Sequence, residues 1–348
     1  MITAGSAQIV LPDVVVPAAA TAGTIRTVLD ILLVTFPFFA LVLAGYIAAR
    51  RRMLPLDAIP GLNSFVLYFA LPCLLYRFGS TTPLAQLLDA SLFLTYLLCA
   101  LILVGFVVAA SMNRRIGWND AAFGALVAVF PNTGFMGVPL LVALLGAAAA
   151  GPVIVTLVVD LVITSSLCIA LSRLDGADEH GVARATKNAL MGMLANPMPW
   201  AILLGALASA IQLVLPKPVM QTIGLLADAA SPVALFTIGA VLARSQMLAA
   251  AHEHAPIPLR DYVPVAFAKL ILHPLLVLLV GAAAIALGAP LAPFALKVMV
   301  LVAALPSASN VAMLAERFGA DNGRIARIIL VSTAAAFFTF SGAVALLH

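Results

Sequence analysis

FPNTGFMGVPL, residues 130–140, and LPSASNV, residues 305–311, are the two stretches that decide the fold of this chain. Each places proline, small residues and an asparagine inside a segment that is otherwise apolar enough to cross a bilayer. The hydrocarbon core tolerates non-helical backbone only where protein or a water-filled cavity satisfies its polar groups. Two interrupted segments at corresponding places in the two halves of a chain are the best sequence indication of a transporter's binding site.

The composition around these stretches is typical of a polytopic membrane protein. Of the 348 residues, 64% are hydrophobic and 9% are charged, and the mean hydropathy is +1.16, whereas soluble domains carry about 25% charged residues. The pI of about 9.2 does not indicate nucleic-acid binding, because the charges fall in short loops. Cys73, Cys99 and Cys168 lie in apolar runs, so no disulfide is expected. We find no enzyme motif, and we predict no catalytic residue, cofactor or metal site.

A helix needs about 20 apolar residues to cross the membrane, and ten segments meet this requirement. They are residues 27–49, 58–76, 88–112, 119–147, 151–173, 196–215, 218–243, 261–287, 291–318 and 322–346, of which the fourth and ninth are the interrupted ones. We expect residues 1–25 to form a flexible leader, because they lack the basic region of a signal peptide. The longest connections are residues 174–195 and 244–260.

The positive charges between the spans predict the orientation of the chain. The loops after the odd-numbered spans carry 13 Lys or Arg residues, whereas the opposite side carries three, Arg26, Arg77 and Lys217. Because cytoplasmic loops are enriched in these residues, we expect both termini on the non-cytoplasmic side. A missed or an invented span would mix the two groups of charges, so this partition also supports the count of ten.

Five spans in each half mean that the second half enters the membrane in the opposite sense from the first, as in an inverted repeat. The prolines at the two breaks, Pro131 and Pro306, are 175 residues apart. We expect the repeats to be residues 26–173 and 196–348, joined by a cytoplasmic linker at 174–195. The loop at 244–260 lengthens the second half, so equivalent pairs need not keep one offset.

The two breaks carry the candidate substrate site. Eleven residues of helix bring the first break about 16 Å into a hydrocarbon core about 30 Å thick. After each break a half-helix begins with unpaired N–H groups and a partial positive charge, which suit an anion. The residues assigned to this site are Pro131, Asn132, Thr133, Gly134, Pro306, Ser307, Ser309 and Asn310. The alternative is a pair of proline-kinked helices without a site.

Ionisable residues inside the apolar segments are a second signal, because they are costly in the membrane and often functional. Asp160 lies at the centre of the fifth span, and Thr156 and Thr164 lie four residues to either side of it, on one helix face. We assign these three residues to the coupling ion, H⁺ or Na⁺; the alternative is a structural ion pair or helix–helix hydrogen bond. Lys269, in the eighth span, either pairs with Asp160 or Asp228 or helps to hold the anion.

Three stretches resemble one known family. NTGFMGVPL, residues 132–140, is similar to the first crossover of the auxin efflux carrier family of membrane transporters, whose bacterial members include proteins labelled malonate transporters. Residues 305–326 resemble its second crossover and the entry to its last span. KLILHP, residues 269–274, resembles its eighth span.

This resemblance implies ten transmembrane helices in two inverted five-helix repeats, a fold shared with bile acid symporters and sodium/proton antiporters. Spans 1, 2, 6 and 7 would form a scaffold, often dimeric, and spans 3–5 and 8–10 a transport domain that moves against it as an elevator. The family's crossover residues correspond to Pro131, Asn132, Pro306 and Asn310. Its substrates are organic anions such as carboxylates. The linker at 174–195 is short where plant members have a long cytoplasmic loop, which argues against auxin as the native substrate.

We therefore predict a secondary active transporter of a small organic anion, malonate or an auxin-like carboxylate, in the bacterial inner membrane. One alternative is a cation/proton antiporter of the same fold, which would need paired acids beside the break, where only Asp160 is found. The other is a membrane sensor that binds a ligand without moving it and that usually carries an appended signalling domain.

Overall fold

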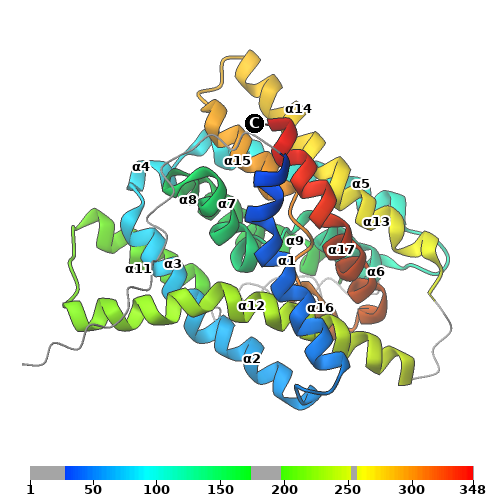
Figure 1. Ribbon diagram of the computed structural model, residues 1–348. Helices are drawn as coiled ribbons and strands as arrows, with labels where there is room; N and C mark the ends of the chain where they lie inside the picture. Colours follow the sequence, from blue (N-terminus) through cyan, green and yellow to red (C-terminus); the bar gives the residue numbers. More distant parts are fainter. Residues whose placement is uncertain (1–27, 174–196, 252–256, 348) are drawn as a thin grey trace, which may run out of the picture.

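The computed structural model describes residues 28–173, 197–251 and 257–347, which Figure 1 shows as ribbons. Within these ranges the secondary structure is helical, apart from one β-bridge between Pro131 and Ser307. Seven helical stretches are long and apolar enough to cross a membrane, and three shorter apolar helices fall within predicted spans 4, 6 and 9. The chain thus has the helices of a multi-pass membrane protein. The predicted leader and the linker at 174–195 lie outside the described residues.

The first half contains helices in each of its five predicted spans. In chain order they are α1 (Val28–Arg50); α2 (Ile59–Phe65), η2 (Val66–Ala70) and α3 (Leu71–Thr81); α5 (Ala90–Ser111); α6 (Trp118–Val129), η3 (Thr133–Gly137) and α7 (Val138–Leu145); and α8 (Ala150–Val158), η5 (Val159–Thr164) and α9 (Ser165–Leu171). The connections contain η1 (Leu56–Ala58), α4 (Leu84–Leu87) and η4 (Ala147–Ala149). The segments η2, η3 and η5 are π-helical, a rare conformation that is frequent at functional sites.

The second half is also helical within its described residues. Its helices are α11 (Pro197–Ala210), α12 (Lys217–Ala251), η6 (Leu259–Asp261), α13 (Val263–Phe267), the π-helical η7 (Ala268–Leu272), α14 (His273–Ala286), α15 (Pro293–Ala303), α16 (Asn310–Arg317) and α17 (Asn322–Leu347). The start of the predicted loop at 244–260 is wrong, because α12 continues to Ala251. Residues 244–251 contain Leu, Met and three Ala but no Gly or Pro, and such residues favour helix.

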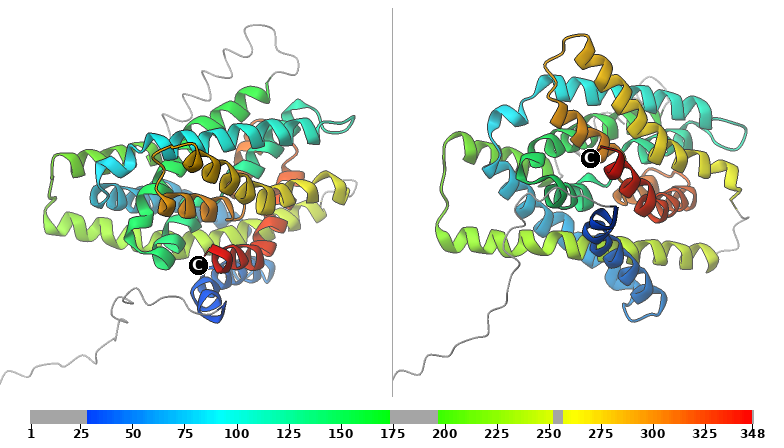
Figure 2. Two further views of the ribbon diagram at one scale, coloured as in Figure 1. Left: turned by 90° about the horizontal axis from the view of Figure 1, so that it is seen from above. Right: turned by 45° about the horizontal axis from the view of Figure 1, so that its top comes forward.

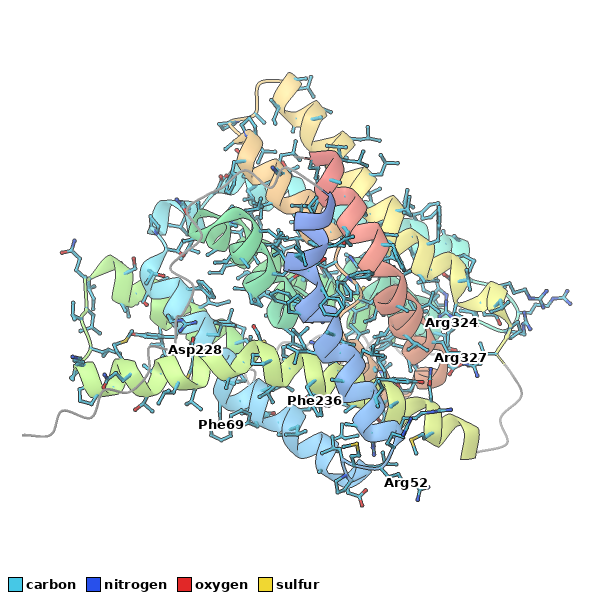
Figure 3. The ribbon with its side chains drawn as sticks, in the orientation of Figure 1. Arg52, Phe69, Asp228, Phe236, Arg324 and Arg327 are labelled. Carbon is cyan, nitrogen blue, oxygen red and sulfur yellow. The ribbon has the colours of Figure 1, made fainter. Side chains whose placement is uncertain are left out.

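Four of these segments, α1, α2–α3, α11 and α12, pack together as a first group, in which α12 lies across the molecule (Figure 1). The contact between α1 and α12 is made by backbone. A Cβ added to Gly45 would lie 1.8 Å from the carbonyl oxygen of Phe236, and one added to Gly239 would lie 1.8 Å from that of Val42. Phe236 is labelled at this crossing in Figure 3. Glycine is required on both helices for so close an approach.

The contact between α3 and α11 is built in the same way. A Cβ added to Gly205 would lie 2.6 Å from the carbonyl oxygen of Tyr76, and one added to Gly79 would lie 3.1 Å from that of Ile202. At both crossings, each glycine therefore meets the carbonyl that lies three residues before the glycine of the other helix.

The two crossings are related by a constant offset in sequence. Gly205 follows Gly45, and Gly239 follows Gly79, by the same 160 residues. Helix α1, of predicted span 1, thus contacts α12, of predicted span 7, in the same way as α11, of predicted span 6, contacts α3, of predicted span 2.

The remaining helices form a second group on one side of α12 (Figure 2, right). Within it α5 packs on α6 and α14, α14 packs on α15, and α15 packs on α8. The interrupted segments α6–η3–α7 and α15–α16 lie in the interior of this group, where the residues around both breaks are largely buried. Surrounding protein thus covers the non-helical backbone, as a membrane protein requires.

Candidate functional site

The two breaks meet and pair through their backbones. Pro131 and Ser307 form an antiparallel bridge. The N–H of Asn132 donates to the carbonyl oxygen of Pro306 at 2.8 Å, and the N–H of Ala308 donates to that of Phe130 at 3.0 Å. The predicted crossing of the interrupted segments is therefore present in the structure.

A helix begins immediately after each break and leaves amide groups free. The N–H groups of Gly134 and Phe135, at the start of η3, and of Ser309 and Asn310, at the start of α16, donate no hydrogen bond within the described residues. The first N–H groups of a helix lack acceptors inside it and carry its partial positive charge. Both half-helices thus present free N–H groups and the positive ends of their dipoles to the crossing.

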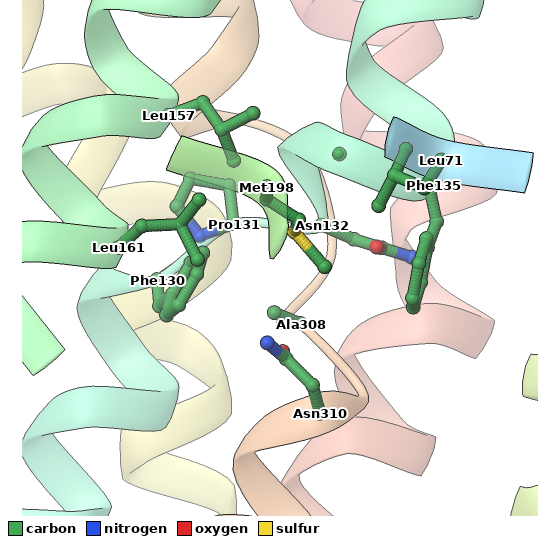
Figure 4. A pocket seen from close by; sticks show the side chains of 11 residues that line it. Leu71, Phe130, Pro131, Asn132, Phe135, Leu157, Leu161, Met198, Ala308 and Asn310 are labelled. Atoms are coloured by element: carbon green, nitrogen blue, oxygen red, sulfur yellow. The ribbon is translucent and has the colours of Figure 1, made fainter. Parts of the chain in front are cut away.

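A small cavity of about 20 Å³ lies at the crossing (Figure 4). Four predicted site residues line it, namely Pro131, Asn132, Gly134 and Asn310. Asn132 is 4% exposed, and within the described part of the chain neither its amide nor that of Asn310 makes a side-chain hydrogen bond. An amide supplies two donors and one acceptor, so both are available to a ligand.

The rest of the cavity wall is apolar and comes from both helix groups. The residues from the second group are Phe130, Phe135, Leu157, Leu161 and Ala308, and those from the first group are Leu71 of α3 and Met198 of α11. Sequence reasoning missed these apolar residues, because nothing distinguishes them from lipid-facing ones until the helices are packed.

The other predicted crossover residues do not line the cavity. Thr133 and Ser307 are fully buried, and Ser309 is 7% exposed. The N–H of Ser307 donates to the hydroxyl of Ser332 at 3.3 Å, whereas the Ser307 hydroxyl has no partner among the described residues. Pro306 contributes the carbonyl oxygen that accepts from Asn132. These residues support the crossing.

Asp160 lies in η5, fully buried, and is held by two hydroxyl groups. The Tyr96 hydroxyl donates to Oδ2 at 3.0 Å, and the Thr164 hydroxyl lies 3.4 Å from Oδ1. Thr156, which was predicted to share this face, instead donates to the carbonyl oxygen of Val153 at 2.8 Å. Thr156 lies in the regular helix α8, before the π-turn, whereas Thr164 lies within η5. Tyr96 was not predicted; the adjacent hydroxyls of Thr95 and Tyr96 in the apolar span 88–112 are the signal that could have found it.

Lys269 lies in η7 and is also fully buried, but it does not line the cavity. Its Nζ donates to the carbonyl oxygen of Ala303 at 2.7 Å and lies 3.1 Å from Nδ1 of His273. The suggested pair between Lys269 and Asp228 is wrong, because Asp228 accepts a hydrogen bond from Arg77 of α3 at 2.7 Å. Within the described ranges no cluster of His, Cys, Asp or Glu is arranged to hold a metal ion.

The known proteins to which this chain is similar are named as transporters. A family model described as "Membrane transport protein" matches residues 30–344. The chain is 29% identical over 307 residues to "Putative malonate transporter" of Rhizobium meliloti (strain 1021), a match that covers 88% of this chain and 92% of that protein. It is 30% identical over 291 residues to "Uncharacterized transporter YfdV" of Escherichia coli (strain K12), with coverage of 81% and 86%. The matched relatives are thus named as transporters.

Proposed function

The chain belongs to the membrane transport protein family, and on this premise we propose that it is a secondary active transporter of a small organic anion that binds where spans 4 and 9 cross. The cavity at this crossing carries the proposal, because the free ends of two half-helices and two unbonded amides meet there. All of these groups donate hydrogen bonds to a carboxylate. None of the described residues that line the cavity is acidic, so nothing in its wall repels an anion.

The walls of the cavity indicate the substrate class. Leu71, Phe130, Leu157, Leu161 and Met198 suit a short hydrocarbon portion, while the donors at the crossing suit a carboxylate. Malonate is the first substrate to test, because the Rhizobium meliloti relative is named for it. An auxin-like monocarboxylate is the second.

The position of the cavity supports an elevator mechanism. Its wall comes from both helix groups, so movement of one group against the other would alter it. We infer that the group around α12 is the scaffold, through which two copies of the chain associate, and that the other group is the transport domain. In this proposal both termini lie on the non-cytoplasmic side of the bacterial inner membrane.

The glycine crossings support the ten-span inverted repeat. A two-fold repeat requires the contact of span 1 with span 7 to recur between spans 6 and 2, and the pairs Gly45–Gly239 and Gly205–Gly79 meet this requirement. The offset grows from 160 residues at these glycines to 175 at Pro131 and Pro306. This change accords with the longer connection between spans 7 and 8.

Asp160 is the proposed coupling site. It is fully buried in the proposed transport domain, where the hydroxyl groups of Tyr96 and Thr164 can orient its carboxyl group. A carboxyl group that gains and loses one proton would link the proton gradient to the anion.

The test is uptake of radiolabelled malonate and of an auxin-like carboxylate by proteoliposomes. Replacing Asn132 or Asn310 with alanine removes one amide that would bond the carboxylate, and hydrogen bonds to charged groups contribute about 1.5–3 kcal/mol, so we expect uptake to fall roughly tenfold or more. Asn113→Ala, in an exposed loop, is the matched control. Unchanged uptake in both crossover variants would exclude this site, and saturable binding without uptake would favour a sensor.

A further inference from the structure

The crossing also contains a helix end of opposite polarity. α15 ends at Ala303, directly before the second break. The last carbonyl groups of a helix lack donors inside it and carry a partial negative charge. In transporters with broken helices, such carbonyl ends coordinate the coupling cation. The end of α15 is thus a place where a cation would be expected.

This position is occupied by the Lys269 ammonium group. Its Nζ donates to the carbonyl oxygen of Ala303 at 2.7 Å and contacts Nδ1 of His273 at 3.1 Å. Lys269 and His273 are both fully buried, so solvent does not compete for the ammonium group. An ammonium group has three donors and no acceptor, which matches a site made of a carbonyl oxygen and a ring nitrogen.

The Lys269 ammonium group forms no ion pair with an acidic side chain of the described residues. Lys269 and Asp160 form no ion pair, and the Asp160 carboxyl group is held by Tyr96 and Thr164 instead. The direct partner of Lys269 is therefore the end of α15, on the opposite side of the break from the half-helix that starts at Asn310.

We propose that Lys269 is a built-in cation that takes the place of a metal cation at the carbonyl end of α15, so that anion binding at the crossing needs no Na⁺. The inference rests on the proposed function and narrows its coupling ion to H⁺. A sodium ion at this end would have to share the same oxygen with a buried ammonium group, and the repulsion of two positive charges at short range is large in a medium of low polarity. Lys269 acts here as a positioning residue, because it holds the backbone that forms the break.

The first test does not depend on the substrate. Hydrogen–deuterium exchange of the purified protein would be compared for the wild type, Lys269→Met and Lys297→Met; Lys297 is a half-buried lysine of α15 itself and provides the matched control. We expect exchange in residues 304–309 to be about tenfold faster in Lys269→Met, as for the loss of a hydrogen bond from a charged donor, and unchanged in Lys297→Met. Unchanged exchange in Lys269→Met, or equal acceleration in both variants, would overturn the role of Lys269.

The second test addresses the ion. Malonate uptake by the wild type would be measured with Na⁺ and with choline as the external cation, at the same pH and membrane potential. We expect equal rates, and a saturable rise with Na⁺ concentration would overturn the proposal. If the wild type transports no carboxylate at all, the proposed function fails, while the exchange experiment still decides whether Lys269 holds the break.

Discussion

Replacing Gly239 with alanine should force α1 and α12 apart. The added Cβ would lie 1.8 Å from the carbonyl oxygen of Val42 and 2.7 Å from the amide nitrogen of Tyr46. Ordinary van der Waals contact begins at 3.4 Å, so the helices must separate by up to about 1.6 Å at the crossing. Because both contacting atoms belong to backbone, no side-chain rotation can relieve the clash.

The expected cost follows from two opposing terms. Overpacking costs about 3 kcal/mol at the upper end of its usual range, where we place a clash with backbone. Alanine in place of glycine stabilises the helix itself by about 1 kcal/mol, because alanine has the higher helix propensity. The net loss of about 2 kcal/mol should lower the melting temperature by about 5 °C, if the shift per kcal/mol resembles that of soluble domains of similar size.

The assay is thermal unfolding of the purified protein in detergent, followed by circular dichroism. Gly224→Ala is the matched control, because Gly224 lies on the same helix and an added Cβ there would meet nothing within 4 Å. We expect Gly224→Ala to be as stable as the wild type or more stable, and Gly45→Ala to lose as much as Gly239→Ala. If Gly239→Ala were as stable as Gly224→Ala, the direct backbone contact and the repeat argument built on it would both be refuted.

Three further perturbations test other parts of the molecule. Asp160→Asn should retain malonate binding but lose the response of uptake to a pH gradient in proteoliposomes; a response that persists would exclude Asp160 as the coupling site. Arg77→Ala and Asp228→Ala both break the same 2.7 Å ion pair between α3 and α12. A double-mutant cycle on thermal unfolding should give a coupling energy of about 1 kcal/mol; stability losses that simply add in the double variant would show that the pair contributes nothing. Arg324→Gln removes guanidinium bonds of 2.7 and 2.8 Å to two backbone carbonyls and should destabilise the protein by about 3 kcal/mol; an unaltered melting temperature would contradict this.

The helices and the two breaks could be predicted because their signals are local. Apolar runs, prolines and the placement of Arg and Lys are visible in the chain without knowledge of its packing. Which residues of the two breaks pair with each other could not be predicted from the sequence. The bridge joins Pro131 to Ser307, 176 residues later, so it forms only after the two segments have packed against each other.

The positions of the buried charges depend on helix geometry that the sequence does not reveal. Asp160 and Lys269 both lie in π-helical turns, where the 3.6-residue period used to assign helix faces no longer holds. The assignment of Thr156, Asp160 and Thr164 to one helix face assumed a regular α-helix. Tyr96 approaches Asp160 from another span, so the pair exists only after α5 and η5 have packed.

The kinds of contact within and between the two helix groups bear on the proposed movement. Within the groups, backbone-to-backbone glycine crossings and hydrogen bonds from buried charged groups, such as that of Lys269, are short and directional. Between the groups, Leu71 and Met198 share an apolar cavity wall with Leu157 and Leu161, and the hydrogen bond between the hydroxyls of Thr35 of α1 and Ser341 of α17 is long, at 3.4 Å. Apolar contacts are non-directional and can be exchanged for similar ones after a displacement. Movement of one group against the other would therefore cost less than deformation of either, which is the balance that an elevator requires.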